Sequence, residues 1–473
     1  MGKITSKSML ISMGKFSIPS IINFIIGFVA VILLTRFFSP EVYGIWNLFN
    51  ATATMMMGIA SMGMGDSFIR FSSELPSGWS LRQLMARCMG IALLCWFFMV
   101  IVFVLYAETT SLIIFNENNV KYIFLLLLAT LALLVLNRFL SNYYRITNQP
   151  GLYSVLQVSI QFVSKLAVLG AIILPDKSLA ALTIETICLF VLLIAFGIKE
   201  KMWCLLRDCF FSFHEAVDVI KFGIESWPVY AVIQSVNFLI PWIIVVGLDK
   251  VSVGLYSSTN IFCTIIAVLT SGFSSYWSPF MYRYYQYEQK RIMKMHNYIL
   301  ILSIFLLGVF ILCQHFAYLF IGDAFQGSRS FFSLVVLNAL FLLLSETTGY
   351  GISIHKKVNE ILIIWVFSIF LLLIVAWFLM PVFNILGVAM AVMISAFVRF
   401  LLISYRGQHY YRSIVSYKLS VSGILILLLL SISNVFLAND YKCECVIIIL
   451  LWILTFVLFR NDLFLIKSKL FNN

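Results

Sequence analysis

Apolar residues fill long stretches of this chain, and each stretch is long enough to cross the hydrocarbon core of a membrane. A window of about 19 residues separates about fourteen such stretches, divided by short segments that carry charged, small polar or proline residues. The short sequence LPDKS separates two predicted spans within 153–198, and MPVFN separates two predicted spans within 358–404. The predicted spans lie near residues 16–35, 42–64, 84–106, 122–141, 153–174, 178–198, 222–247, 254–278, 297–321, 330–353, 358–380, 384–404, 419–437 and 443–459.

Composition agrees with this pattern. Of the 473 residues, 62% are hydrophobic and only 11% are charged, whereas a soluble domain carries about 25% charged residues. No soluble core could bury so much apolar sequence. We therefore expect an all-α polytopic membrane protein with about fourteen transmembrane helices.

The basic residues predict how the chain is oriented. If the N-terminus is cytoplasmic, 25 of the 32 lysines and arginines fall in cytoplasmic segments, six fall in outer segments, and Lys165 lies within a span. This asymmetry follows the positive-inside rule. We therefore expect both termini to be cytoplasmic. The net charge of +12 reflects topology, so nucleic-acid binding is not expected.

The segments between the predicted spans leave little room for enzyme chemistry. All are short, and no P-loop, metal-ligand cluster or Ser-His-Asp spacing occurs in the sequence. The nine cysteines are scattered and are typical of small apolar packing residues. We expect no catalytic residues, no metal and no cofactor, so the protein is not predicted to be an enzyme.

A weak internal repeat indicates two halves. KFSIPSIINF, which begins at Lys15, is similar to KFGIESWPVYAVIQSVNF, which begins at Lys221. RFFSPEVYGIW, from Arg36, is similar to GLDKVSVGLY, from Gly247. The first and seventh spans lie an even number apart, so the two copies have the same orientation, as in a parallel pseudo-twofold repeat. The predicted domains are a six-helix bundle over 1–198, a cytoplasmic linker over 199–221, a second six-helix bundle over 222–406, and two extra helices with a cytoplasmic tail over 407–473.

The segment QVSIQFVSKLAVLGAIILPD carries Lys165 near its middle. A lysine at that depth costs about 2.5–3.5 kcal/mol on insertion scales. On a helix, Gln157, Gln161 and Lys165 share one face, and such a polar stripe must face protein or water. Two interpretations of Lys165 stay open: a structural ion pair with Glu185 in the next span, and a binding site for an anion.

Other predicted spans also carry polar faces, and Arg138 and Arg145 lie at the end of the fourth span. Interhelical hydrogen bonds, worth roughly 0.6 kcal/mol each, explain single amides, but their recurrence in spans 1, 2, 7 and 8 favours a shared cavity. Two interpretations of Glu346 stay open: an ion pair with His355 or Lys356, and a binding site for a coupling ion. Glu185 is the second candidate for binding a coupling ion. The amides that we expect in the cavity are Asn23, Asn47, Asn50, Gln157, Gln161, Gln234, Asn237 and Asn260.

Several segments resemble a known family. The run VILLTRFFSPEVYGIWNLFNA, from Val31, resembles the signature between the first two spans of bacterial polysaccharide exporters: an Arg-aromatic pair, a Ser-Pro turn and then Tyr-Gly. GLDKVSVGLYSSTNIF, NYYRITNQPGLYSVLQ and the arrangement of six, six and two spans resemble the same family. The chain is similar to O-antigen flippases of the Wzx type, in the multidrug/oligosaccharidyl-lipid/polysaccharide exporter superfamily.

This resemblance implies a specific activity. Two six-helix bundles would face each other around a central cavity, and alternating access would move an oligosaccharide on undecaprenyl diphosphate from the cytoplasmic to the periplasmic leaflet of the bacterial inner membrane. The cationic cavity of such proteins is matched here by Lys165, Arg138 and Arg145 in the first half. A polysaccharide polymerase and a chain-length regulator are the candidate protein partners.

Two other functions stay open. An ion-coupled drug exporter of the same superfamily would need acidic cavity residues, of which this sequence has few, and would lack the two extra spans. An O-antigen polymerase or ligase would normally carry a large periplasmic loop with arginines, and no such loop occurs in the sequence.

Overall fold

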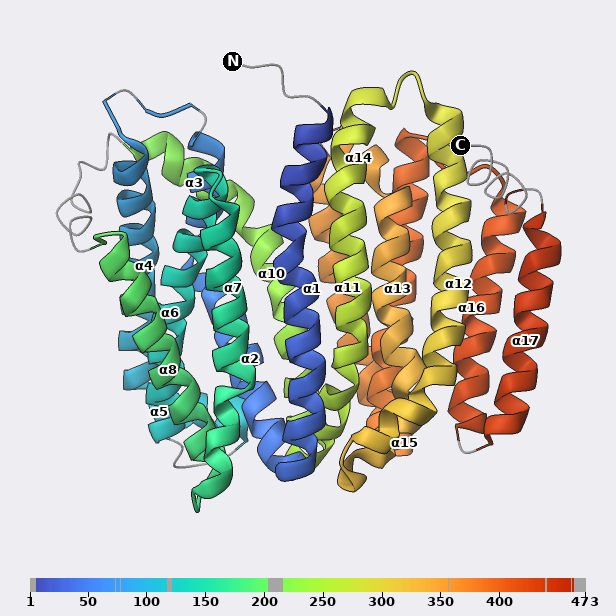
Figure 1. Ribbon diagram of the computed structural model, residues 1–473, viewed down its shortest axis with the longest axis horizontal. Coiled ribbons are helices and arrows are strands. Elements are labelled where there is room, and N and C mark those ends of the chain that lie inside the picture. Colours follow the sequence, from blue (N-terminus) through green and yellow to red (C-terminus); the bar gives the residue numbers. More distant parts are fainter. Residues whose placement is uncertain are drawn as a thin grey trace. The chain divides into compact units, whose positions relative to one another are not determined.

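The computed structural model describes residues 6–72, 74–76, 78–116, 121–202, 216–355, 357–438, 440–460 and 462. These residues form helices and no strand, which confirms the predicted all-α class (Figure 1). The helices are α1 (Ser6–Phe37), α2 (Pro40–Ala60), α3 (Met64–Phe71), α4 (Leu81–Leu105), α5 (Ala107–Phe115), α6 (Lys121–Ile146), α7 (Pro150–Lys165), η1 (Ala167–Ile173), α8 (Lys177–Lys199), α10 (Val217–Gly247), α11 (Lys250–Tyr284), α12 (Gln289–Phe320), η3 (Asp323–Phe331), α13 (Phe332–Thr348), α14 (Tyr350–Ile354), α15 (Val358–Tyr410), α16 (Tyr417–Leu437) and α17 (Tyr441–Leu458).

The chain forms two compact units, Met1–Gly254 and Leu255–Asn473. In the first unit, α1 packs along α7, and α10 packs against α2 and α3. In the second unit, α13 packs against α15 and α12, and α16 lies between α12 and α17. The predicted division into two six-helix bundles stays a prediction, and residues 203–215 of the predicted linker lie outside the described residues.

Ten described helices are long and apolar enough to span a membrane, or eleven if the bent helix α11 counts as one span. The chain is thus a multi-pass membrane protein, and the count of fourteen stays a prediction. The shortfall lies in three helices. Helix α1 has 32 residues, and its part Ile22–Phe37 is a further apolar helix that the count of ten does not include. In α2 the amides Asn47 and Asn50 reduce the hydropathy, and α15 is counted once although it contains two helices joined at Asn384.

Helix α15 explains how two predicted spans became one element. It has 53 residues and consists of two helices joined at Asn384, each long enough to cross the roughly 30 Å of a hydrocarbon core. Within it, Asn384 has φ 49° and ψ −132°, which is not helical. Ser368 Oγ donates to the Ser395 carbonyl at 3.2 Å, so the two helical parts fold back on each other at the break that the MPVFN sequence predicts.

The segment that carries Lys165 forms one candidate span, as predicted, since Pro150–Ile173 is long and apolar enough to cross a membrane. It is not α-helical throughout. Helix α7 ends at Lys165, and the chain continues as the 3₁₀ helix η1. Lys165 therefore lies in the last turn of an α-helix, where the helix macrodipole favours a cation. This position offsets part of the cost of a lysine at that depth.

Several helices begin where the sequence supplies a side chain that caps them. Ser39 precedes Pro40 and accepts a hydrogen bond from the Val42 N–H, and Ser80 and Gln83 form a capping box at α4. Asp176 accepts the Leu179 N–H at 3.1 Å at the start of α8. That backbone hydrogen bond holds the pKa of Asp176 below its usual range, so the cap stays charged at neutral pH.

The glycines of the internal repeat meet in the first unit. A Cβ on Gly44 would lie 2.1 Å from the Lys250 carbonyl oxygen, and a Cβ on Gly254 would lie 1.9 Å from the Pro40 carbonyl oxygen. Gly44 thus meets Lys250, four positions before Gly254, and Gly254 meets Pro40, four positions before Gly44. The Val-Tyr-Gly and Val-x-Gly elements let the starts of α2 and α11 approach backbone to backbone.

We predict that Gly44→Ala and Gly254→Ala both destabilise the protein, by about 1–3 kcal/mol each, because the added methyl group overlaps rigid backbone. The thermal unfolding midpoint of the purified protein would fall in both variants. Gly272→Ala is the control on α11, since nothing lies within 4 Å of its added Cβ. Equal midpoints for all three variants would contradict the close backbone contact.

Candidate functional site

A buried carboxylate organises the first polar cluster, which we call the Lys165 cluster and which consists of Lys165, Trp46, Asn50 and Glu185. Glu185 on α8 is 1% exposed. Its Oε2 accepts hydrogen bonds from Trp46 Nε1 at 2.6 Å and from Asn50 Nδ2 at 3.1 Å, both on α2. Lys165 Nζ lies 4.4 Å from the centroid of the Trp46 ring. Helices α2, α7 and α8 therefore converge on one indole, which binds the acid through its N–H and the cation through its face.

Lys165 and Glu185 do not form a direct ion pair. No nitrogen–oxygen distance within 4 Å joins these two residues, both of which the structure describes. Glu185 instead takes its hydrogen bonds from Trp46 and Asn50. The Lys165 ammonium thus rests on a π face and keeps N–H donors that a further acceptor could use.

The second polar cluster, which we call the Arg138 cluster, consists of Arg138, Asp66, Tyr230, Gln234 and Asn237. The Arg138 guanidinium lies 4.0 Å from the centroid of the Tyr230 ring, and its Nη2 lies 3.1 Å from Asp66 Oδ1. Gln234 donates to the Tyr230 hydroxyl at 3.0 Å, and Asn237 donates to Gln234 at 3.3 Å. One chain of polar contacts thus runs from α3 through α6 and along α10.

Gly65 admits the Arg138 side chain against α3. A Cβ at that position would lie 2.3 Å from Arg138 Nε. The Arg138 side chain is 13% exposed and that of Asp66 is 37% exposed. The cation is therefore mostly buried while its acid partner reaches solvent, an arrangement in which a second anion could compete for the guanidinium.

The other predicted residues of the first unit are more dispersed. Gln157 donates to Ser141 at 2.7 Å, and Asn47 donates to the Tyr43 carbonyl at 2.8 Å. The Oδ1 atom of Asn23 on α1 is buried and has no hydrogen-bond partner among the described residues. Arg145 is exposed in the last turn of α6, and Gln161 is half-buried on α7. These residues extend the polar surface without joining either cluster.

Two predicted residues belong to the second unit. Glu346 accepts a hydrogen bond from the Tyr350 hydroxyl at 3.3 Å. His355, a suggested partner of Glu346, instead lies 3.0 Å from the Gly351 carbonyl through its Nδ1 atom and stacks on Tyr410. Lys356, the other suggested partner, lies outside the described residues. Asn260 is exposed on α11.

Sequence reasoning missed an internal cation in the second unit. We counted Arg399 with the cytoplasmic residues, but it lies 11 residues before the end of α15 and is only 4% exposed. Its guanidinium lies 4.1 Å from the centroid of the Trp365 ring, and its Nη2 donates to Asn338 at 3.4 Å. The available signal was the apolar run FLLIS, which continues beyond Arg399.

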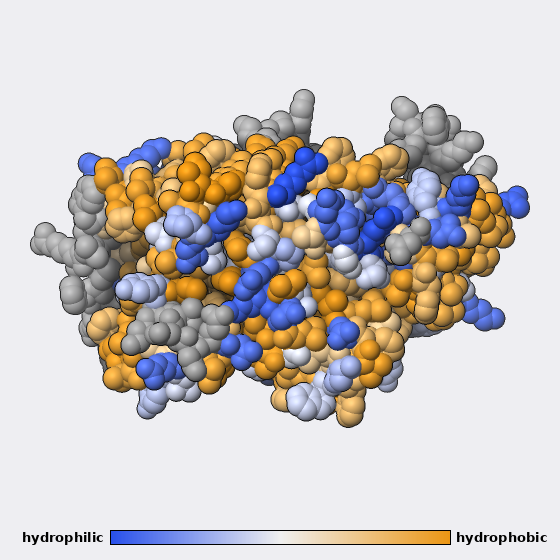
Figure 2. Space-filling model, turned by 90° about the horizontal axis from the view of Figure 1, so that it is seen from below, coloured by the Kyte–Doolittle hydropathy of each residue, from blue (hydrophilic) through white to orange (hydrophobic). Residues whose placement is uncertain are grey.

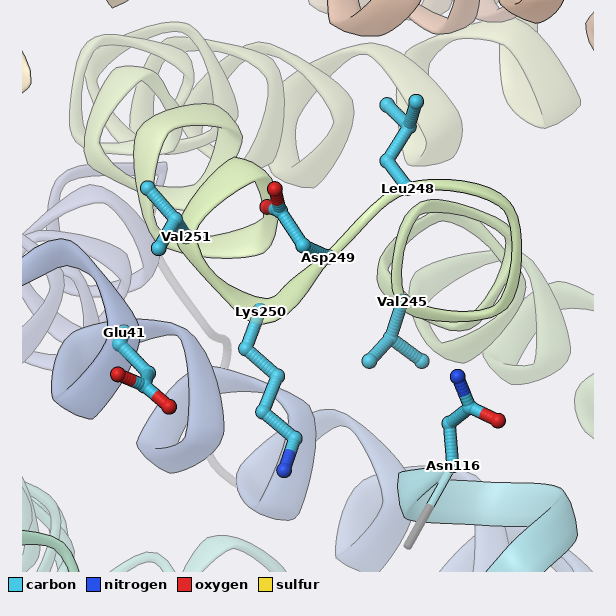
Figure 3. A pocket seen from close by; sticks show the side chains of 7 residues that line it. All are labelled: Glu41, Asn116, Val245, Leu248, Asp249, Lys250 and Val251. Carbon is cyan, nitrogen blue, oxygen red and sulfur yellow. The ribbon is translucent and has the colours of Figure 1, made fainter.

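A small pocket lies in the first unit where α10 gives way to α11. It has a volume of about 330 Å³ and is lined by Glu41, Asn116, Val245, Leu248, Asp249, Lys250 and Val251 (Figure 3). The lining contains two acids and one lysine, so the pocket has no surplus of positive charge to attract an anion. Hydrophilic side chains also gather between hydrophobic ones on the face in Figure 2. The Lys165 and Arg138 clusters are therefore the better candidates for anion binding.

Comparison with known protein structures identifies similar folds. The chain is 14% identical to a structure titled lipid II flippase MurJ in an inward closed conformation, with a TM-score of 0.68, over 94% of this chain and 99% of that one. It is 15% identical to the MATE multidrug transporter DinF-BH, with a TM-score of 0.60, over 85% of this chain and 97% of that one. The fold is thus the one these two proteins share.

Comparison at the level of sequence gives the family. No curated protein matches the chain. The profile of a family described as polysaccharide biosynthesis protein matches residues 15–284, which is more than half of the chain and includes both polar clusters of the first unit. The chain therefore belongs to the polysaccharide biosynthesis protein family.

Proposed function

We propose that this protein is a flippase that moves an oligosaccharide linked to undecaprenyl diphosphate, such as an O-antigen repeat unit, from the cytoplasmic to the periplasmic leaflet of the bacterial inner membrane. Family membership and a fold like that of MurJ support the transport of a lipid-linked saccharide. The observation that carries the proposal is the pair of cations, Lys165 and Arg138, that lie on aromatic rings inside the first unit.

A diphosphate needs such cations to cross hydrocarbon, because an unpaired charge there is costly. Arg138 offers planar N–H donors that suit bidentate contact with phosphate oxygens, and Lys165 offers a compact ammonium. Both side chains are held against rings rather than locked into a fully buried ion pair. They are therefore poised to exchange the π face for a phosphate oxygen.

The saccharide needs hydrogen-bonding partners, and amides surround both cations. Gln234 and Asn237 continue from Tyr230 along α10, and Asn50 lies beside Trp46 on α2. Amide groups can donate to and accept from sugar hydroxyls. The apolar lipid chain can remain in the bilayer while the two halves of the protein alternate access to the head group.

Glu346 and Glu185 are the proposed sites for a coupling ion. Glu346 is contacted by a tyrosine hydroxyl and lies on a membrane-spanning helix. Glu185 is bound by an indole and an amide. An acid in a span is a candidate for binding a proton or sodium ion. A polymerase and a chain-length regulator are the proposed protein partners, because they would act on the product of translocation.

Drug export is the second candidate function, and likeness to the fold of DinF-BH supports it. The two functions need opposite charges, since a cationic drug requires acids and a diphosphate requires cations. The experiment uses proteoliposomes that contain the purified full-length chain. One assay follows the accessibility of a fluorescent polyisoprenyl-diphosphate oligosaccharide to an external glycosidase, and the other follows uptake of a cationic rhodamine dye. Translocation of the glycolipid alone supports the flippase, and dye transport alone overturns it.

We predict that Lys165→Gln lowers the initial rate of glycolipid translocation by about 10-fold or more, because a charge-assisted hydrogen bond contributes about 1.5–3 kcal/mol. Lys165→Arg should retain most activity because it keeps the charge. Lys199→Gln is the matched control, since Lys199 is an exposed lysine in the last turn of the neighbouring α8. A wild-type rate for Lys165→Gln would assign Lys165 a packing role only.

We predict opposite effects for the two partners in the Asp66–Arg138 ion pair. Asp66→Asn should lower the KM for the glycolipid by about two- to fivefold, because a partly exposed ion pair contributes about 0.2–1 kcal/mol and its loss frees the guanidinium. Arg138→Met should raise the KM and slow translocation. If both variants lower thermal stability and leave KM unchanged, Arg138 has a structural role.

A further inference from the structure

The second unit holds a cavity that the proposed transport function does not use. It has a volume of about 450 Å³ and lies between the end of α15 and the start of α16, beside α12. Its lining residues come from these helices and the turn that joins α15 to α16. They are His296, Phe400, Leu401, Ser404, Tyr405, Gln408, His409, Ile414, Tyr417, Ser420, Val421 and Ile424.

The exposed side chains of the lining change from tyrosines near the helix ends to aliphatic residues further along the helices. Tyr405 and Tyr417, near the helix ends, are 71% and 56% exposed. Val421 and Ile424 follow on α16, and Ile424 lies seven residues beyond Tyr417, which corresponds to about 10 Å along the helix. Exposed tyrosines mark the interfacial depth of a membrane, and aliphatic side chains mark acyl-chain depth. The cavity therefore has the profile of a groove for an amphiphile.

The inner wall of the cavity is already satisfied by protein. His296 is completely buried, with its ring nitrogens 2.8 Å from Thr347 Oγ1 and from Ser420 Oγ. Ser404 is paired with Thr348, and Gln408 bonds to Ser413. The polar groups at the base are thus committed to one another, so recognition of a ligand falls to the mouth of the cavity.

Exposed basic residues lie next to lining residues in the sequence. Arg412 precedes the lining residue Ile414 by two positions, and Lys418 follows the lining residue Tyr417. Lys290 and Lys294 are exposed on the first turns of α12, which also supplies His296. Gln289 donates to the Arg412 carbonyl at 3.1 Å, which ties the start of α12 to the turn. One exposed acid, Glu288, precedes these residues on α12. The mouth therefore carries a surplus of positive charge.

Two further acids at this end of the helices are already engaged. Asp462 Oδ2 accepts a hydrogen bond from Asn297 Nδ2 at 2.9 Å, beside the lining residue His296. Glu360 at the start of α15 accepts a hydrogen bond from the Tyr410 hydroxyl at 2.5 Å and lies 3.9 Å from Arg406 Nε. It therefore leaves the charge surplus of Arg412, Lys418, Lys290 and Lys294 in place. The positive-inside rule assigns this end of the helices to the cytoplasmic leaflet, whose anionic lipids attract basic clusters.

We propose that this cavity binds an anionic phospholipid of the cytoplasmic leaflet, with one acyl chain between α15 and α16 and its head group against Arg412 and Lys418. The phosphodiester would meet the basic mouth, and the acyl chain would lie against Leu401, Val421 and Ile424. The lipid would add to the direct packing of α16 on α12 and α13. It is independent of the cations proposed to bind the transported diphosphate.

The experiment is native mass spectrometry of the purified, delipidated full-length chain with phosphatidylglycerol or with phosphatidylethanolamine of identical acyl chains. Val421→Trp fills the cavity, and Leu425→Trp is the matched control, because Leu425 is equally exposed one turn further along α16 but does not line the cavity. Arg412→Gln and Lys418→Gln remove head-group contacts. Lys442→Gln removes an exposed lysine at the start of α17 and is the control for charge.

We expect tighter binding of phosphatidylglycerol than of phosphatidylethanolamine, with about fivefold weaker binding for each basic residue removed. Val421→Trp should abolish saturable binding, whereas Leu425→Trp and Lys442→Gln should bind as the wild type does. Equal binding of the two lipids, or wild-type binding by Val421→Trp and by the Arg412→Gln, Lys418→Gln double variant, would overturn the proposal. So would complete displacement of phosphatidylglycerol by equimolar polyisoprenyl diphosphate, which would assign the cavity to the transported lipid.

Discussion

The cost of placing charge within hydrocarbon governs the polar interior of this protein. Glu185 is 1% exposed within a membrane-spanning helix, so its oxygens must be satisfied by neighbouring protein groups. Trp46 and Asn50 both donate to its Oε2 atom, and the same indole then supports the Lys165 ammonium. Because the acid is satisfied by neutral donors, the cation is not neutralised by a direct ion pair.

Aromatic support of cations recurs in both units. Lys165 lies on Trp46, Arg138 on Tyr230 and Arg399 on Trp365, with distances to the ring centroids between 4.0 and 4.4 Å. A π face stabilises a desolvated cation without cancelling its charge, at about 2 kcal/mol or more. Of these three cations only Arg138 also contacts a carboxylate, that of the partly exposed Asp66 at 3.1 Å, among the described residues.

The sequence predicted much of the fold because long apolar runs and turn residues act locally. The all-α class, the break at Asn384 and the glycines Gly44 and Gly254 were all visible in it. The sequence did not predict how deeply single charged residues lie or which residues they contact. The end of α7 at Lys165 and the burial of Arg399 depend on neighbouring helices. Trp46 was missed because its indole links three helices that are distant in sequence.

Lipid binding tests the central claim most directly. The affinity of the purified chain for polyisoprenyl diphosphate is compared with its affinity for the matching unphosphorylated polyisoprenol, in the wild type and in the Lys165→Gln, Arg138→Met double variant. The account predicts that the wild type prefers the diphosphate by about 100-fold or more, from two charge-assisted contacts of about 1.5–3 kcal/mol each, and that the double variant loses this preference. An unchanged preference in a folded double variant would contradict it.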